Sequence, residues 1–345
     1  MIHLRDSLAS LVQGQRLNPQ QLRLAFDDLL DPDVPPSMAA GWLTALRMAG
    51  ENGETLAAAV DAVMARMVDF GPAESLDSIR LDTCGTGGDH ACSLNISTAA
   101  AFVCAAAGVT VVKHGNRSAT GKSGSSEVLE KLGIRLDLAV DQLRQSVIEQ
   151  GFAFLFAPAF HPALKTLAPI RKSLPFRTVF NMVGPLANPA RPTHQLLGVA
   201  DIALAELFAE VLQKKGITRA AIISGQDGLD EVSLGAPTRA LIVTPEGCEE
   251  HLWHPELTFG LPMYHPNCVQ VDSPEESARR IRSVFEARPE HPADEAYIVA
   301  NAAAALWVAG KVGSPIAGVG LARQVIESGK AMSKLTDYAR FTQSR

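Results

Sequence analysis

The sequence of 345 residues lacks several features that mark specialised protein classes. It has no apolar run of about 18 residues, the length that a membrane-spanning helix requires, and its first residues include no continuous apolar segment of an export signal. The five cysteines form no CxxC pair, so we expect reduced thiols in a cytoplasmic protein. GxSxG and HExxH are also missing, which leaves serine-triad hydrolases and zincins without support.

Positive charge is scarce as well. Lys and Arg number 31 against 37 Asp and Glu, a formal net charge of −6. Binding nucleic acid without sequence preference usually needs a basic face, so we expect no nucleic-acid partner, although a local basic pocket for a small anion is compatible with this balance. The apolar content of 47% and charged content of 20% are those of an ordinary globular protein.

Hydrophobic periodicity separates an N-terminal helical region from a longer α/β region. Residues 1–75 place apolar residues at helical spacing in four segments and contain no strand pattern. We expect a small α-helical lobe, which either supports the rest of the chain or forms a dimer interface. From residue 78 strands and helices alternate, which predicts a mostly parallel sheet covered on both faces. The expected strands are 78–83, 109–115, 152–158, 194–200, 219–225 and 238–244.

The segment DTCGTGGDHACSLNIST, residues 82–98, is the strongest local signal. Its glycines allow backbone N–H groups to approach an anion, and it leads into an apolar helix that we expect to begin at Ser97 and Thr98. A glycine turn before a helix N-terminus favours the binding of phosphate. The motif KHGNR, residues 113–117, follows the next strand, and Ser123 to Ser125 form a second small-residue turn. Taken alone, KHGNR could be a solvated loop.

Two further segments carry charge. Asp230 and Glu231 follow the strand at 219–225; adjacent carboxylates suit Mg²⁺ with substrate phosphates, and an acidic solvated turn is the alternative. The run 160–189 is predicted to hold Lys165, Arg171, Lys172 and Arg177 on a helix and to end at Gly184–Pro185. Arg suits a planar carboxylate, but spacing alone leaves open which Arg faces the site. His251 and His254 we interpret as surface or packing residues.

Together these motifs resemble the anthranilate phosphoribosyltransferase family, from about residue 5 to residue 340. The matching segments are GTGGD…NIST, KHGNR…GKSGS, FAPAFHPALK…RTVFNMVGPLANP and DGLDEVSL. The resemblance implies transfer of phosphoribose from 5-phosphoribosyl diphosphate (PRPP) to the amine of anthranilate in tryptophan biosynthesis. It also implies a nucleoside-phosphorylase-like fold, a homodimer through the helical lobe, and two Mg²⁺ ions bound with PRPP. The lobes would be 1–75 with part of 171–192, and 76–170 with 193–345.

The resemblance also assigns site residues, motif by motif. PRPP would be bound by Gly85, Gly88, Asp89, Ser93, Asn95, Ser97, Thr98, Lys113 and Ser125. Anthranilate would be bound by Gly85, His114, Asn116, Arg171 and Gly184, with Arg171 facing the carboxylate. Ser97 and Glu231 would ligate one Mg²⁺, and Asp230 with Glu231 the second. No residue is assigned as a general acid or base.

The sequence departs from the family pattern at several positions: His90, Cys92, Ser93, Leu94, Glu127 and Pro175. These changes spare the assigned ligand positions, except that Ser93 keeps only the hydroxyl, and they could suit a different aromatic amine. The alternatives are a paralogue acting on another aromatic amine, a nucleoside phosphorylase of the same fold, and a non-catalytic nucleic-acid-binding relative. The last should be basic and should lack Asp230–Glu231 or Arg171.

Overall fold

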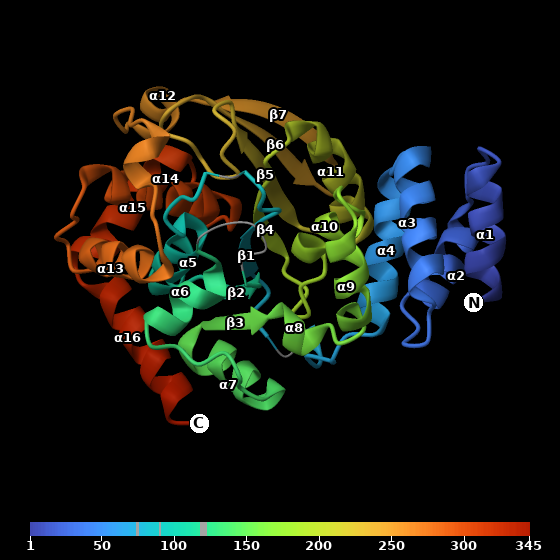
Figure 1. Cartoon of the computed structure of the whole chain (residues 1–345). Coiled ribbons are helices and arrows are strands. Elements are labelled where there is room, and N and C mark those ends of the chain that lie inside the picture. Colours follow the sequence, from blue (N-terminus) through green and yellow to red (C-terminus); the bar gives the residue numbers. More distant parts are fainter. Residues whose placement is uncertain (74–75, 90, 118–122) are drawn as a thin grey trace. The chain divides into compact units, whose positions relative to one another are not determined.

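The computed structural model describes residues 1–73, 76–89, 91–117 and 123–345 (Figure 1). The chain forms two compact units. Unit 1 comprises Met1–Asp69 and Ala157–Pro189, and unit 2 comprises Phe70–Phe156 and Ala190–Arg345. The sequence placed only part of 171–192 with the N-terminal helices. The returning segment instead begins at Ala157, because the backbone N–H of Val68 donates to the carbonyl of Phe160 at 2.8 Å and the later helix α9 packs on α3.

Unit 1 is helical, as its periodicity predicts. Asn18 begins the second helix with a capping box: its side chain accepts from Gln21 N, and its own N–H donates to Gln21 Oε1, both at 2.9 Å. Phe26 and Trp42 are fully buried and meet edge to face, with ring centroids 5.0 Å apart. The helices are α1 (Ile2–Val12), α2 (Pro19–Leu29), α3 (Pro36–Ala49), α4 (Gly53–Ala65), α8 (Ala157–Phe160), α9 (Leu164–Ser173), α10 (Phe180–Val183) and the 3₁₀ helix η2 (Gly184–Leu186).

The expectation of one helix carrying Lys165 to Arg177 was wrong. Helix α9 ends at Ser173, and the next residue, Leu174, is extended with φ −86° and ψ 131°. A residue before proline disfavours the helical region, and proline has no N–H to donate. Pro175 therefore ends the helix, and Arg177 lies beyond it.

Unit 2 is built on a seven-stranded sheet with the order β3-β2-β1-β4-β5-β6-β7. Strands β1 to β5 pair in parallel, and β6 and β7 add as antiparallel neighbours. The strands are β1 (Arg80–Gly85), β2 (Thr110–Gly115), β3 (Phe152–Phe156), β4 (His194–Gly198), β5 (Arg219–Gly225), β6 (Thr238–Thr244) and β7 (Gly247–Trp253). The mostly parallel sheet confirms the predicted fold class.

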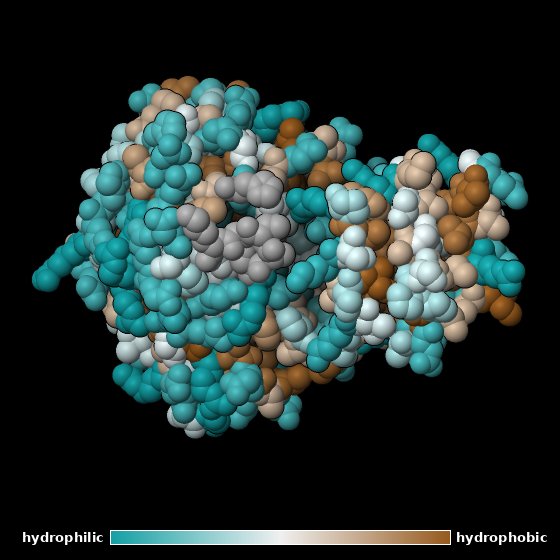
Figure 2. Space-filling model, in the orientation of Figure 1, coloured by the Kyte–Doolittle hydropathy of each residue, from teal (hydrophilic) through white to brown (hydrophobic). Residues whose placement is uncertain are grey.

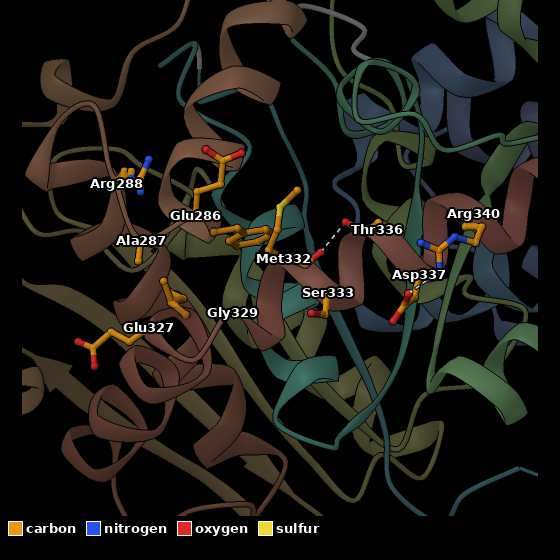
Figure 3. A pocket seen from close by; sticks show the side chains of 12 residues that line it. Glu286, Ala287, Arg288, Glu327, Gly329, Met332, Ser333, Thr336, Asp337 and Arg340 are labelled. Carbon is orange, nitrogen blue, oxygen red and sulfur yellow. Dashed lines mark hydrogen bonds and ion pairs between the residues drawn. The ribbon is translucent and has the colours of Figure 1, made fainter.

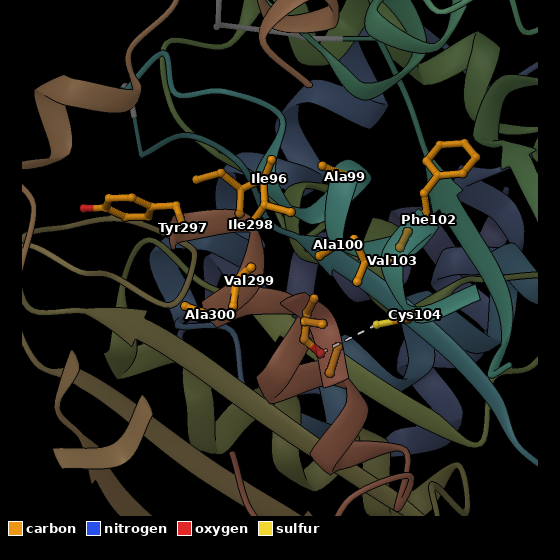
Figure 4. Close-up of a cluster of buried hydrophobic side chains, with 14 of the residues drawn as sticks. Ile96, Ala99, Ala100, Phe102, Val103, Cys104, Tyr297, Ile298, Val299 and Ala300 are labelled. Atoms are coloured by element: carbon orange, nitrogen blue, oxygen red, sulfur yellow. Dashed lines mark hydrogen bonds between the residues drawn. The ribbon is translucent and has the colours of Figure 1, made fainter. Parts of the chain in front are cut away.

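Helices cover the sheet of unit 2. They are α5 (Ile96–Ala106), α6 (Ser125–Lys131), α7 (Val140–Gln150), α11 (Ala205–Lys214), α12 (Pro255–Phe259), α13 (Pro274–Phe285), α14 (Pro292–Val308), α15 (Pro315–Glu327) and α16 (Lys330–Gln343), with 3₁₀ helices η3 (Ile202–Leu204) and η4 (Pro266–Val269). Helices α5 and α14 pack on each other and on the sheet. Figure 4 shows their side chains meeting in the main core, where Cys104 Sγ donates to the carbonyl of Ala302 at 3.7 Å.

Side chains of the strands alternate between two cores. In β5, Ala221 and Ile223 belong to the main core with α5 and α14, whereas Ala220 and Ile222 are equally buried but lie outside that cluster. Helix α11 packs on β5 and β6 and presents Phe208 and Leu212 as buried residues. A strand that is buried on both faces fits the nearly continuous apolar run RAAIIS.

The sequence missed strand β7, because its exposed side chains EEHL give no apolar alternation. His251 lies on this strand, with its ring 6.5 Å from that of Trp307 and its Nε2 3.3 Å from Glu249 Oε1. These contacts agree with a packing role. Within the ranges that the structure covers, no helix is both long and apolar enough to cross a membrane.

Candidate active site

The site of unit 2 begins where the strand order changes direction. Strand β1 lies between β2 and β4, and ligands of open α/β sheets bind at such a switch point, outside the carboxyl ends of the strands. There β1 and β4 end in a paired Gly85 and Gly198. A Cβ on Gly85 would lie 2.7 Å from Asp230 Oδ2, and one on Gly198 would overlap the carbonyl oxygen of Asp230. Gly198 must therefore be glycine for the backbone of the loop after β5 to approach, whereas a side chain at Gly85 would displace the Asp230 carboxylate.

Asp230 and Glu231 come together with the other predicted PRPP segments. The N–H of Gly87 donates to Asp230 Oδ2 at 2.9 Å, and the N–H of Ser97 donates to Glu231 Oε1 at 3.1 Å. Ser97 lies in the first turn of α5, so Glu231 caps that helix at its positive dipole end. Residues more than 130 positions apart in the chain thus form one cluster.

Burial changes the protonation of this carboxylate pair. Removal from water, followed by the nearby charge of Asp89, raises the pKa of Asp230 to about 7. Removal from water and the charge of Asp230 raise the pKa of Glu231 to about 8, although Lys113 acts in the opposite direction. A cluster of acids poised near neutrality is typical of a functional site.

Lys113 is the buried cation beside these acids. Its Nζ donates to the carbonyl of Thr83 and lies 3.3 Å from Ser97 Oγ. Burial lowers the pKa of Lys113, and the charges of Asp82 and Glu231 oppose that shift. The ammonium group, which the sequence suggested as a phosphate partner, thus lies beneath the start of α5 and beside the acids.

The glycine loop is arranged differently from the simple anion turn that we expected. Gly87 and Gly88 adopt left-handed φ values of 61° and 84°, which glycine accommodates without strain. The N–H of Thr86 donates to the carbonyl of Gly198 at 2.9 Å, and that of Gly87 serves the Asp230 carboxylate. Asp89 Oδ1 accepts from Ala91 N at 3.2 Å. His90 lies outside the described residues.

Helix α5 begins one residue before the predicted Ser97–Thr98 start. Asn95 is its N-cap residue, but the Asn95 side chain does not cap the helix. Instead Asn95 Nδ2 donates to the Ser123 carbonyl at 3.2 Å, and Ser123 Oγ donates to Asn95 Oδ1 at 2.8 Å. Asn95 therefore ties the two predicted phosphate turns together. Thr98 Oγ1 is buried and has no hydrogen-bond partner among the described residues.

The KHGNR segment follows β2 as predicted. The N–H of His114 donates to Asp82 Oδ1 at 3.3 Å. Ser125 Oγ donates to the carbonyl of Asn116 at 3.2 Å, which joins the start of α6 to this loop. His114 is buried, and Asn116 is exposed.

Arg171 and Gly184 belong to unit 1. Arg171 lies in the last turn of α9, with its guanidinium carbon 5.8 Å from the centre of the Phe180 ring. Its Nε is buried and hydrogen-bonds to no residue that the structure describes, and burial lowers the pKa of Arg171. A Cβ on Gly184 would meet no atom within 4 Å, so the space beside this backbone is open.

The sequence did not predict the role of Asn301. This residue hydrogen-bonds to the backbone of Val232 in the acidic loop that carries Asp230 and Glu231. Asn301 Oδ1 accepts from Val232 N at 2.8 Å, and Asn301 Nδ2 donates to Val232 O at 3.1 Å. We interpreted the stretch ANAAAAL only as a packed helix. A single amide within an otherwise apolar and fully buried helix was the signal for this role, because a buried amide requires partners.

A separate surface pocket lies among the C-terminal helices. It has a volume of about 600 Å³ and is lined by residues of α15, α16 and the turn after α13, including Arg288, Met332 and Arg340 (Figure 3). None of its lining residues is a predicted site residue. Within the described ranges, no group of three or more His, Cys, Asp or Glu side chains is arranged to hold a metal. Any ion at Asp230–Glu231 therefore needs ligands from elsewhere, such as substrate phosphates.

Comparisons with known proteins agree with this geometry. Residues 77–332 match the glycosyl transferase family α/β domain, and residues 5–67 match its helical bundle domain. Anthranilate phosphoribosyltransferases from Acetivibrio thermocellus and Methylobacterium radiotolerans are 39% and 41% identical, each over 99% of this chain and 97% and 96% of their own lengths.

Solved structures give the same result. The Thermus thermophilus anthranilate phosphoribosyltransferase is 35% identical with a TM-score of 0.89, covering 98% of this chain and 99% of its own. The Saccharomyces cerevisiae enzyme in complex with PRPP and Mg is 27% identical with a TM-score of 0.88, covering 99% and 98%. Near-complete coverage by relatives about 40% identical establishes the assignment that the motifs indicated: the chain belongs to the anthranilate phosphoribosyltransferase family.

Proposed function

We propose that this protein transfers the phosphoribosyl group of PRPP to the amine of anthranilate, giving N-(5-phosphoribosyl)anthranilate and pyrophosphate in tryptophan biosynthesis. The observation that carries the proposal is the partly buried pair Asp230–Glu231, which meets the glycine loop through Gly87 and the start of α5 through Ser97. A relative of the same fold is described in complex with PRPP and Mg.

The residues present fit Mg²⁺ on chemical grounds. The carboxyl groups of Asp82, Asp230 and Glu231 lie close enough to Lys113 to raise its pKa against the effect of burial, and carboxylate oxygens, once ionised, suit a divalent cation. Ser97 with Glu231 would hold one ion and Asp230 with Glu231 the second. Bound Mg²⁺ would supply a Lewis acid that stabilises the charge on the departing pyrophosphate.

The chain's own residues then bind and orient PRPP. The N–H of Gly87 donates to Asp230 Oδ2 at 2.9 Å, and it would serve a phosphate oxygen if that carboxylate held a cation instead. Thr98 Oγ1 offers a buried hydroxyl that hydrogen-bonds to no residue that the structure describes. Gly85, Gly88, Asp89, Ser93, Asn95, Lys113 and Ser125 complete the proposed PRPP set.

Anthranilate is positioned without a dedicated acid or base. Its amine is neutral near pH 7, so holding the amine in line with the ribose carbon contributes more to the reaction rate than removing a proton from it beforehand. Arg171 is the proposed partner of the carboxylate, because its buried Nε lacks a hydrogen-bond acceptor in the described protein. Gly85, His114, Asn116 and Gly184 are the other proposed anthranilate residues.

We also propose that the protein is a cytoplasmic homodimer joined through its helical unit. Ile2, Val12 and Met48 on α1 and α3 are 74%, 75% and 84% exposed, and Figure 2 shows hydrophobic side chains on the surface over the unit 1 helices. Light scattering of the wild type and of a Met48→Asp variant tests this: the variant should shift towards a monomer. An unchanged mass would argue against this face.

The function is tested by following the loss of anthranilate fluorescence in the presence of PRPP and Mg²⁺. We expect turnover that requires both, with 4-aminobenzoate and ring-substituted anthranilates run in parallel. Faster turnover of another aromatic amine would assign the protein to a paralogous reaction. Absence of turnover with every amine would reject the proposal.

A further inference from the structure

Residues 92–94, in the second half of the glycine loop, pair with residues 269–271, which are distant in the sequence. Leu94 N donates to Val269 O at 2.7 Å, and Val271 N donates to Cys92 O at 2.9 Å. These bonds flank an antiparallel bridge between Ser93 and Gln270. Cys92 has a φ of 50°, an uncommon conformation for a residue with a side chain, so the surroundings must hold it in place.

Helix α13 holds the partner segment through Arg280. Arg280 Nη1 donates to the Gln270 carbonyl at 2.7 Å, and Nη2 donates to the Cys268 carbonyl at 2.6 Å. Arg280 Nε also donates to Asp294 Oδ2 at 3.0 Å. Asp294 is fully buried in the first turn of α14, so the guanidinium is fixed in orientation on one side and binds two loop carbonyls on the other.

The same helix reaches the glycine loop directly, one turn earlier. Ser277, which is fully buried, accepts from Asn95 N at 3.2 Å and donates to Asn95 Oδ1 at 2.8 Å. Because residues three apart lie on one face of a helix, Ser277 and Arg280 act on adjacent parts of the same loop. The Ser277 contact also fixes the amide that joins Asn95 to Ser123.

We propose that the Ser277–Arg280 face of α13, anchored by Asp294, positions residues 92–95 for PRPP. Ser277, Arg280 and Asp294 are positioning residues that act through the loop backbone. For the identity of the ligand this inference rests on the proposed function. For the ordering of the loop it rests only on the contacts above.

Two variants and one control test the proposal. Ser277→Ala removes both hydrogen bonds to Asn95 and introduces no charge, and Asp294→Asn weakens the anchor of Arg280. Ser146→Ala is the matched control, because Ser146 is equally buried and donates only to the carbonyl of Phe152, at 2.6 Å. Amide hydrogen exchange at residues 94 and 95 is measured without ligand. The KM for PRPP, the KM for anthranilate and kcat are measured by the loss of anthranilate fluorescence.

We expect exchange at residues 94 and 95 to rise about tenfold or more in both variants while strands β4 and β5 keep their protection. We expect the KM for PRPP to rise about tenfold, with kcat and the KM for anthranilate within twofold. Ser277→Thr should restore the wild-type exchange. Unchanged exchange at residues 94 and 95 in Ser277→Ala would overturn the proposal. A loss of protection that extends across the whole of unit 2 and is no larger than that in Ser146→Ala would also overturn it.

The two proposals can fail separately. If the wild type turns over no amine with PRPP, the proposed function is wrong, and the exchange measurement still decides whether α13 orders the loop. If the wild type is active and Ser277→Ala leaves both exchange and the KM for PRPP unchanged, the inference about α13 is wrong and the proposed function stands.

Discussion

Arg171 holds a permanent charge at a half-buried position. Guanidinium groups stay protonated at any physiological pH, so the partial burial that lowers the pKa of Arg171 carries a desolvation cost that a bound carboxylate would offset. We expect Arg171→Ala to raise the KM for anthranilate about tenfold to a hundredfold, equivalent to about 1.5–3 kcal/mol for a charged hydrogen bond. The KM for PRPP should change much less.

Lys172 supplies the control for this prediction. It lies next to Arg171 in the last turn of α9 and is exposed. Lys172→Ala removes the same charge from the same turn and should leave the KM for anthranilate within twofold. Equal increases in both KM values for Arg171→Ala would remove Arg171 from the carboxylate site.

Gly198 is the second single residue on which the site depends. Any side chain there would overlap the backbone of Asp230, so the acidic loop must move away. We expect Gly198→Ala to lower the free energy of unfolding by about 1–3 kcal/mol and kcat/KM for PRPP at least about tenfold. Gly320→Ala is the matched control, because Gly320 is exposed in α15 with open space around it; wild-type kinetics for Gly198→Ala would contradict the prediction.

At the scale of elements, α14 connects the core to the acidic loop. Asn301→Ala would leave the buried N–H and carbonyl of Val232 without their present partner. We expect a loss of about 2–4 kcal/mol in the free energy of unfolding, because each buried unsatisfied group costs about 1–3 kcal/mol. Urea denaturation measures this loss. Asn267→Ala, an exposed Asn→Ala change, should stay within about 0.5 kcal/mol; a similarly small loss for Asn301→Ala would show that water replaces the amide.

Sequence pattern predicted the elements whose signal is local. The apolar runs at β1 to β6 follow from neighbouring residues, and the structure has these strands. The motif glycines pointed to the edge where Gly85 and Asp230 meet. Local pattern cannot tell which distant segments touch, so the bonds from Ser277, Arg280 and Asn301 to the loops were not foreseen. Strand β7 was missed because pairing with β6, not apolar alternation, defines it.

Across the whole molecule, the acid pair couples ligand binding to pH. In the ligand-free protein Asp230 and Glu231 keep their protons up to about pH 7 and about pH 8, whereas in the unfolded chain both ionise near pH 4. The folded state therefore binds more protons between these limits, and its stability falls as pH rises through this window. A cation needs the ionised acids, so the stabilisation by Mg²⁺ with PRPP should grow over the same range.

We expect the apparent Kd for Mg²⁺ in the presence of PRPP to fall about tenfold or more between pH 6 and pH 8, measured by calorimetry. The phosphates of PRPP also titrate near pH 6, so the Asp230→Asn variant serves as the control for their share. A pH dependence that is identical in wild type and Asp230→Asn would mean that Asp230 does not contribute to it.

The hydrogen bonds between Asn301 and Val232 join residues that the ribosome adds at different times. Ribosomes release the N-terminal part first, at about 5–20 residues per second, so Asn301 emerges roughly 3 to 14 s after Val232. During that interval the nascent chain holds its glycine loop and its acids but lacks the amide that fastens Val232 and the helix that covers the core. We therefore expect polypeptides cut short before α14 to lack the partner of Val232 and to bind no PRPP.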